Sequence, residues 1–260
     1  MLQQLDASDL HLIESPIYTH AGSRVAPGDA ARNRTPRYAY RSGNARLGAL
    51  LCQGVDVRLE TVVARFQRTN GAFELNGEEF DALILTAPTP VTTQLLEASG
   101  ERRPIAQATY RPCLSVLLGY EMPPPSQAYH ALIDPDQRQP LTWLSIESVK
   151  CPGRAPDGCT ALVAQMSPSF SKQEFDAPEA QVVHDAATFV SRLFGPKWLS
   201  PAVSGVKRWR YSLPEGLALF ETVNHPGSKL LIAGDALLGG RVEYAYETGV
   251  KAAQMLISGS

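Results

Sequence analysis

The sequence has no excess of either charge and no long apolar run. Its 260 residues carry a formal net charge of −2, and Trp209 interrupts the densest basic cluster at residues 207–210. No stretch approaches the roughly 18 apolar residues that a membrane-spanning helix needs. The opening stretch MLQQLDASDLHLIE carries acids instead of the basic and apolar regions of a signal peptide. These absences argue against nucleic acid and membrane as partners, and they predict a soluble, cytoplasmic protein.

The cysteines and histidines show no metal-binding spacing. The four cysteines include no CxxC pair, and the five histidines form no HExxH or similar cluster. The cysteines are Cys52, Cys113, Cys151 and Cys159. We expect no metal site and predict that these thiols are reduced and structural.

The predicted elements divide the chain into a lead-in and two interleaved regions. Residues 1–37 are polar and turn-rich, which predicts an irregular segment. Residues 38–98 combine a short helix, an alternating strand in VDVRLETVVARF and a buried strand in FDALILTA, a pattern typical of an α/β domain. Residues 99–214 contain strands punctuated by turns, as in an antiparallel sheet. The α/β pattern returns at 215–260, so the antiparallel region is predicted to interrupt one domain.

The closing stretch LLIAGDALLGGRVEYAYETGVKAAQML predicts a strand, an acidic turn, a glycine loop and a helix. Leu230–Ile232 form a short apolar run of the kind found in a strand covered on both faces. The run stops at Gly234 and Asp235, and a small-residue helical pattern begins at Val242. By itself this pattern is compatible with Asp235 closing a turn or capping the helix.

Several stretches jointly resemble the flavin-dependent amine-oxidase-like proteins, most closely the bacterial renalase-like oxidoreductases. They are RYAYRSGNARLGALL, VRLETVVARF, FDALILTAPTPVTTQLL, LTWLSIESVKCPGR, VKRWRYSLP and LLIAGDALLGGRVEYAYETGVKAA. The resemblance implies an α/β fold with an α+β insert. It assigns 38–98 and 215–260 to a partial Rossmann-like FAD-binding domain and 99–214 to an antiparallel-sheet substrate domain. The implied reaction passes a hydride from a reduced nicotinamide-like compound or an amine to FAD, and then to oxygen.

The resemblance also implies a set of cofactor contacts. A carboxylate at the carboxyl end of a strand accepts hydrogen bonds from cofactor hydroxyls, and a helix start offers backbone N–H groups and a positive dipole end to the flavin ring. Asp235 and the backbone of Val242 and Glu243 stand at the matching positions. The predicted cofactor-binding residues are Val63, Ala87, Pro88, Gly234, Asp235, Arg241, Val242 and Glu243.

Aromatic residues of the insert are the candidates for a substrate pocket. The predicted residues are Trp143, Trp209, Arg210 and Tyr211. Broad rings hold a planar small molecule, and Arg210, with Lys150, attracts a phosphate or a carboxylate. Packing inside the sheet is the alternative role of each aromatic ring. Strand alternation predicts that Trp209 and Tyr211 share one face and that Arg210 takes the other. No residue is assigned as catalytic, because hydride transfer leaves the chemistry to the cofactor.

One family feature is missing. The family holds the FAD pyrophosphate on a strand–GxGxxG–helix unit, and no GxGxxG occurs in the first 60 residues of this sequence. We therefore expect weak FAD binding by this chain alone. We also expect that the segment 2–35, a second copy of the chain or a separate N-terminal partner covers the strands left without neighbours. The alternative function is that of a non-catalytic truncated paralogue or fragment acting as a binding or assembly subunit, and shared ancestry without shared activity is a further alternative.

Overall fold

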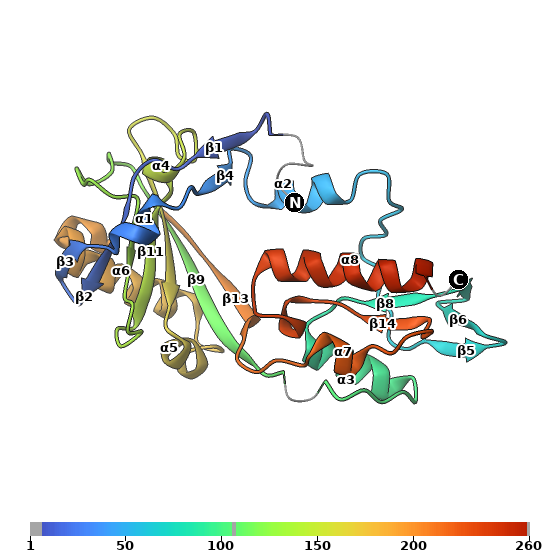
Figure 1. Ribbon diagram of the computed structural model, residues 1–260. Helices are drawn as coiled ribbons and strands as arrows, with labels where there is room; N and C mark the ends of the chain where they lie inside the picture. The colour runs from blue at the N-terminus through green and yellow to red at the C-terminus, as the bar shows by residue number, and fades with distance from the viewer. Residues whose placement is uncertain (1–6, 106–107, 259–260) are drawn as a thin grey trace. The chain divides into compact units, whose positions relative to one another are not determined.

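The computed structural model describes residues 7–105 and 108–258, which form two compact units (Figure 1). Unit 1 contains 56–105, 108–111 and 211–258, and unit 2 contains 7–55 and 112–210. These boundaries differ from the predicted domains at residues 38–55, which cluster with unit 2, and at 99–105, 108–111 and 211–214, which cluster with unit 1.

A seven-stranded sheet organises unit 2, in the order β13-β9-β12-β11-β10-β2-β3. Its strands are β2 (Ile17–Ala21), β3 (Arg24–Pro27), β9 (Tyr110–Tyr120), β10 (Ala131–Ile133), β11 (Leu141–Ile146), β12 (Thr160–Met166) and β13 (Val203–Pro214). Antiparallel pairing dominates, and β2 runs parallel to β10. A separate pair joins β1 (Leu10–Leu12) to β4 (Tyr38–Tyr40). The helices are α1 (Ala30–Arg34), α2 (Ala45–Leu51), α4 (Glu147–Lys150), α5 (Pro168–Gln173), α6 (Glu179–Phe194) and the 3₁₀ helix η2 (Pro196–Leu199).

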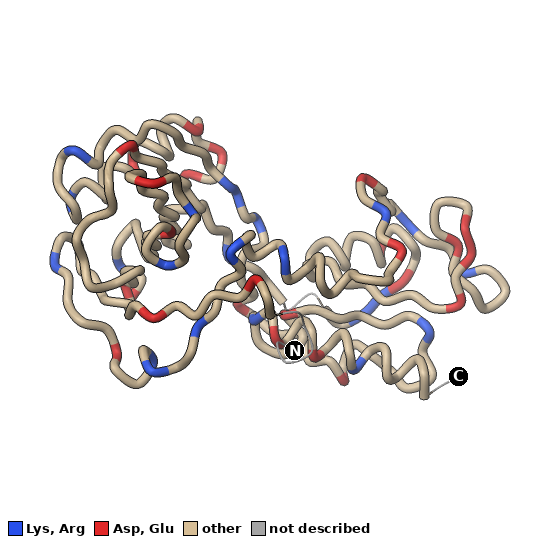
Figure 2. Tube along the Cα trace, turned by 90° about the horizontal axis from the view of Figure 1, so that it is seen from above, with Lys and Arg blue, Asp and Glu red and all other residues tan. Residues whose placement is uncertain are grey.

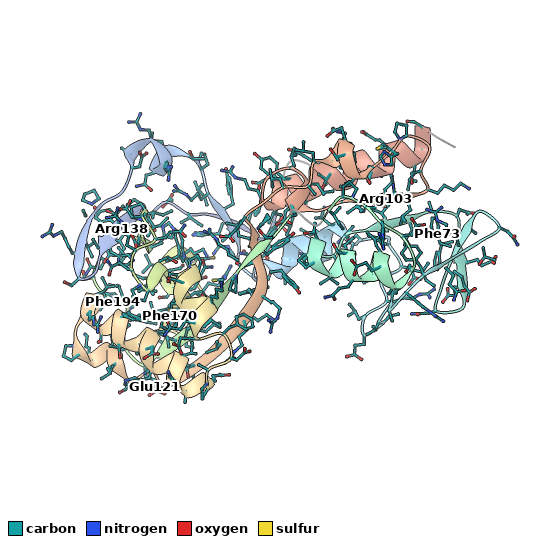
Figure 3. All side chains as sticks on the ribbon, turned by 90° about the horizontal axis from the view of Figure 1, so that it is seen from below. Phe73, Arg103, Glu121, Arg138, Phe170 and Phe194 are labelled. Atoms are coloured by element: carbon teal, nitrogen blue, oxygen red, sulfur yellow. The ribbon has the colours of Figure 1, made fainter. Side chains whose placement is uncertain are left out.

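The two faces of this sheet differ in how well they are covered. Alternate residues of β9, such as Leu114 and Leu118, are buried in one core cluster with Val182 and Val190 of α6. Phe170 of α5 packs at the margin of the same cluster and is labelled in Figure 3. The β9 residues that alternate with these face the other side of the sheet, where Leu117 is 49% exposed. The sheet therefore has one face buried under helices and one face that is partly open, here called the open face.

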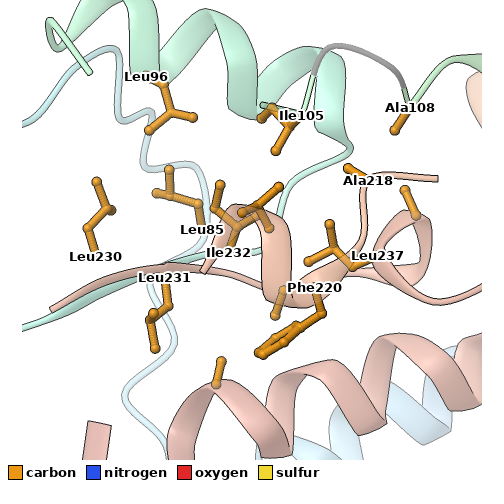
Figure 4. Packing of buried hydrophobic residues seen from close by; sticks show 14 of the residues in the cluster. Leu85, Leu96, Ile105, Ala108, Ala218, Phe220, Leu230, Leu231, Ile232 and Leu237 are labelled. Carbon is orange, nitrogen blue, oxygen red and sulfur yellow. The ribbon is translucent and has the colours of Figure 1, made fainter. Parts of the chain in front are cut away.

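Unit 1 is built around a short parallel pair. β8 (Leu83–Leu85) and β14 (Leu230–Ile232) pair in parallel, and β5 (Gln67–Thr69), β6 (Ala72–Leu75) and β7 (Glu78–Phe80) form an antiparallel meander. The helices are α3 (Thr89–Ala98), α7 (Phe220–Val223), the 3₁₀ helix η3 (Asp235–Leu237) and α8 (Val242–Ser258). Figure 4 shows Leu230, Leu231 and Ile232 packed with Leu85, Leu96 and Phe220. All three residues of β14 are at most 1% exposed.

The strand predicted at 55–66 does not form. Residues 55–66 lack regular secondary structure, and β5 begins only at Gln67. Val55, Val57, Leu59 and Val62 are 62%, 50%, 82% and 81% exposed. An alternating apolar pattern gives a strand only when a neighbouring strand pairs with its backbone groups. Within the described residues, no strand forms a backbone ladder with this segment.

The lead-in segment also differs from its prediction. Residues 10–27 contain β1, β2 and β3, and β2 and β3 extend the edge of the unit 2 sheet. The edge strand β10 accepts β2 because Ala131, Leu132 and Ile133 offer a second ladder of backbone groups beside β11. Residues 2–6 of the predicted covering segment lie outside the described residues.

Surface charge in this fold is mixed. Figure 2 shows acidic and basic positions interspersed along the trace. Among residues 7–105 and 108–258, no helix combines the length and apolar character required to cross a bilayer. The same residues bring no three His, Cys, Asp or Glu side chains into a position to hold a metal ion.

Candidate functional site

The turns of the predicted cofactor site follow the carboxyl ends of the two parallel strands in unit 1. β8 and β14 are paired with Leu83 opposite Leu230 and Leu85 opposite Ile232, so their carboxyl ends coincide. Ala87 and Pro88 follow β8, and Gly234 and Asp235 follow β14. The region outside the carboxyl ends of parallel strands is where α/β folds bind ligands.

Asp235 makes two hydrogen bonds through one carboxylate oxygen. Its Oδ1 accepts from the hydroxyl of Tyr110 at 3.0 Å and from the backbone N–H of Ala236 at 2.8 Å. Its own carbonyl accepts from Leu238, Gly239 and Gly240, which closes the loop after the strand. The turn-closing role considered as an alternative therefore describes part of what Asp235 does. The Tyr110 contact adds a partner 125 residues away.

Tyr110 is a site residue that sequence reasoning missed. Burial raises its pKa to about 12, and the charge of Asp235 and the hydrogen bond to it act in the same direction. Its ring also packs edge-on against Tyr211, with centroids 5.9 Å apart. No spacing rule links Tyr110 to a turn at Asp235, so only the folded chain identifies the pair.

The start of α8 offers free backbone donors. The N–H groups of Tyr244 and Ala245 bond to the carbonyl of Arg241, whereas those of Val242 and Glu243 make no hydrogen bond within the described residues. Val242 is 60% exposed, so solvent or a ligand reaches this turn. Unpaired N–H groups and the positive end of a long helix attract an electron-rich group.

Two contacts hold this helix against the turn. The Thr248 hydroxyl accepts from the Gly234 N–H at 3.0 Å and lies 3.1 Å from its carbonyl oxygen. The Tyr244 ring lies on Gly239, where an added Cβ would come within 2.7 Å of it. Gly239 therefore admits the tyrosine that stands after Glu243.

Val63, the remaining predicted cofactor contact, lies in the irregular segment of unit 1. It is half-buried, and its neighbour Val62 accepts a hydrogen bond through its carbonyl from the side chain of Asn76 at 3.1 Å. The structure provides no strand at Val63 on which a planar group could rest, and its role as a cofactor contact stays a prediction.

The predicted pocket tryptophans lie in one row across the open face of unit 2. Trp143 is opposite Gln165, which is opposite Ser115, and the Trp209 indole N–H donates to the Ser115 hydroxyl at 3.2 Å. Three strand spacings separate the two rings, or about 14 Å. The two tryptophan rings therefore lie on either side of the polar residues Gln165 and Ser115, and they are too far apart to hold one planar ring between them. Trp209 is 48% exposed, and the Lys207 ammonium lies 5.2 Å from its ring centroid.

The basic candidates do not join this row. Arg210 takes the opposite face of β13, with its guanidinium 4.5 Å from the ring centroid of Phe175, so the alternation predicted for Trp209 and Arg210 is confirmed. Lys150 donates to Glu147 at 2.9 Å.

Comparison with known proteins gives one family match and several similar solved structures. The family model described as flavin containing amine oxidoreductase matches residues 11–257. Putrescine oxidase, in a structure bound to putrescine, superposes with a TM-score of 0.62 at 14% identity over 86% of this chain and 54% of its own. Cyclohexylamine oxidase from Brevibacterium oxydans IH-35A gives 0.61 at 15% identity over 83% and 53%. A proposed protoporphyrinogen oxidase from Exiguobacterium sp. 255-15 gives 0.64 at 18% identity over 84% and 52%.

At these identities the solved structures establish a shared fold, the mixed α/β architecture of flavoprotein oxidases. The chain spans about half the length of each of these proteins. Flavin is the cofactor of the family that the sequence matches over almost its whole length. The chain belongs to the family of flavin-containing amine oxidoreductases.

Proposed function

We propose that this chain contributes the substrate sheet and one side of the flavin site to a renalase-like FAD-dependent oxidoreductase. The substrate class is a reduced nicotinamide-like compound or an amine, with the exposed Trp209 ring and Trp143 as pocket walls. The observation that carries the proposal is the arrangement of Asp235 and the uncapped start of α8 at the carboxyl ends of β8 and β14, in a chain of this family.

The residues present fit one part of the cofactor. The Asp235 carboxylate is oriented by Tyr110, and its Oδ2 is not used in either of its hydrogen bonds, so it suits a cofactor hydroxyl. The N–H groups of Val242 and Glu243 suit the electron-rich edge of the flavin ring. When bound, FAD supplies a hydride acceptor that oxygen regenerates. The sequence contains no glycine loop for the pyrophosphate.

The sheet of unit 1 has one edge free for a further strand. The N–H of Leu83 and the carbonyl of Leu85 bond to residues flanking β14. Because backbone groups alternate in direction along a strand, the N–H and carbonyl of Ile84 point away from β14. Within the described residues, no strand pairs with that side of β8.

We propose that a strand–glycine loop–helix segment, supplied in cis or by a separate chain, pairs with this edge of β8. Such a segment places its glycine loop at the carboxyl ends of the parallel strands, beside the turns at Ala87 and Asp235. The neighbours matched by this chain are about twice its length, which is consistent with a missing portion of that kind. The exposed apolar residues at 55–62 offer further surface for it to bury.

The test is the visible spectrum of the purified protein, alone and with a family-type N-terminal segment supplied in cis or in trans. We expect near-stoichiometric flavin only with the segment. Asp235→Ala then weakens flavin binding by roughly 1–3 kcal/mol, the scale of a lost charge-assisted hydrogen bond. Asp81→Ala, at an exposed position just before β8, is the matched control and leaves flavin binding unchanged.

The outcomes separate the two candidate functions. Stoichiometric FAD on the chain alone would contradict the need for a further segment and would exclude the non-catalytic role. No flavin with any segment, in a protein that is folded by circular dichroism, would support the second candidate. That candidate is a binding or assembly subunit, and the absent glycine loop favours it.

A further inference from the structure

A cavity of about 450 Å³ lies on unit 2, away from the tryptophan row. It is lined by β9, β12 and the start of β13, including Leu117, Gly119, Ala161, Val163 and Gly205. Gly119 stands four residues beyond Ser115 on β9, or about 13 Å along the strand. Its volume falls in the range of about 300–1,000 Å³ that is usual for small-molecule sites.

Small residues line this cavity, and the space is open over Gly205, whereas the Val203 side chain covers Gly119. Gly119 and Ala161 are directly opposite each other in the β9–β12 ladder, and Gly205 lies on β13. A Cβ added at Gly205 would meet no atom within 4 Å, so the space above it is open. Leu117 and Val203, which are 49% and 70% exposed, supply apolar side walls. The walls therefore suit an apolar molecule.

One end of the cavity is charged, through Glu147 and Arg154. Glu147 is 8% exposed, and both of its carboxylate oxygens are occupied. Oε1 accepts from the Ser145 hydroxyl at 2.6 Å and from Lys150 at 2.9 Å, and Oε2 accepts from Arg154 at 3.1 Å. A cationic ligand would find no unused carboxylate oxygen here.

The balance of charge at this end is positive. Two cations, Lys150 and Arg154, face a single carboxylate. Burial raises the pKa of Glu147, but the hydrogen bond from Ser145 and the charges of Lys150 and Arg154 outweigh it and hold this pKa below its ordinary value. Arg154 is anchored by a second bond to the Tyr40 carbonyl at 2.5 Å, which fixes the guanidinium at the cavity wall. A fixed guanidinium with N–H groups to spare binds a carboxylate.

We propose that this cavity binds an apolar molecule with a single anionic head group, such as a medium-chain carboxylate. The apolar body lies over Ala161 and Gly205, beside the Val203 side chain that covers Gly119, and the head group lies at Arg154. The proposal does not depend on flavin binding, because every residue involved belongs to unit 2 and none belongs to the proposed cofactor site.

The experiment measures binding of octanoate, octanol and octylamine to the full chain by titration calorimetry. We expect octanoate to bind at least about tenfold more tightly than the other two, a difference of about 1.4 kcal/mol. Its affinity should fall as salt is raised, because screening weakens the charge contact. Equal affinities of the three probes would overturn the proposal.

Two variants locate the site. Gly205→Leu fills the cavity and should weaken octanoate binding about tenfold or more. Gly48→Leu is the matched control, because Gly48 is an exposed glycine of α2 with equally open space and lies outside the cavity lining. Arg154→Gln should abolish the preference for octanoate over octanol. Should Arg154→Gln fail to fold, Gly205→Leu decides alone, and undiminished octanoate binding in it would overturn the proposal.

Discussion

The two outer edges of the parallel strand pair in unit 1 differ in whether their backbone groups have hydrogen-bond partners. On the outer edge of β14, side chains replace a neighbouring strand: Asn224 bonds both the N–H and the carbonyl of Ile232 at 2.8 Å. Ser228 does the same for Leu230, and Arg103, labelled in Figure 3, adds a longer contact to the Leu230 carbonyl. On the outer edge of β8, no described strand pairs with Ile84.

This difference shows which edge ends the sheet. Capped backbone groups cannot accept another strand, because their hydrogen bonds are already made. Unpaired backbone groups on the partly buried apolar strand β8 provide a template for pairing. The sheet therefore ends at β14 and is open to extension at β8, which supports the proposal of an added segment on that side.

The largest effect is expected from removing the cap on β14. Asn224 is 2% exposed, and Asn224→Ala leaves two buried backbone groups without partners. Each costs about 1–3 kcal/mol, so we expect the free energy of unfolding to fall by about 2–6 kcal/mol in urea denaturation.

A matched control exists in unit 2. Asn33 bonds the N–H and carbonyl of Ile17 in the same way, at 3.0 and 2.9 Å, but is only partly buried. Water can replace those bonds, so Asn33→Ala should cost about 1 kcal/mol or less. Equal losses in the two variants would mean that burial does not distinguish the two caps.

An intermediate effect on stability is expected from a change in Asp235, which follows the carboxyl end of β14. Asp235→Asn removes the charge beside Tyr110, so the pKa of Tyr110 should fall from about 12 toward its ordinary value while burial keeps it raised. The loss of stability should be about 1 kcal/mol, the scale of one weakened hydrogen bond. Ultraviolet titration of tyrosinate, or nuclear magnetic resonance of labelled tyrosine, measures the pKa.

Tyr120 serves as the internal reference for this titration. Its pKa is also raised to about 12, by burial alone, and should not change in Asp235→Asn. Because the folded state raises both pKa values above the unfolded value of about 10, the stability from these neutral tyrosines is complete below pH ~10 and is lost as pH rises toward ~12. A shift of both tyrosines in the variant would indicate a general loosening instead of a local charge effect.

The smallest effect on stability is expected at the exposed segment before β5. Leu59 and Val62 are more than 80% exposed, so the double variant Leu59→Ser, Val62→Ser should change the free energy of unfolding of the chain alone by less than about 0.5 kcal/mol. The same variant should weaken association with a supplied N-terminal segment, measured by sedimentation. A large loss of stability without any segment would show that these side chains are buried by the chain itself.

Sequence patterns anticipated the features that depend on neighbours along the chain. The strand at Leu230–Ile232, the turn at Gly234 and Asp235 and the helix from Val242 formed where the apolar run, the acidic turn and the small-residue periodicity placed them. The opposite faces of Trp209 and Arg210 followed from strand alternation. In each case the local geometry of a strand or a helix decides the outcome.

Contacts between distant segments were decided only by the tertiary structure. The alternating run at 55–66 carries a strand pattern, yet it forms no strand, because pairing requires a partner that no local pattern can supply. The lead-in joined the sheet of unit 2 because the edge of β10 was available there. Tyr110 reached Asp235, and Arg154 reached Glu147 and Tyr40, through folding of the chain and not through spacing. The sequence determined which residues can form strands, turns and helices, whereas the tertiary structure decided which backbone edges are paired and which polar groups meet.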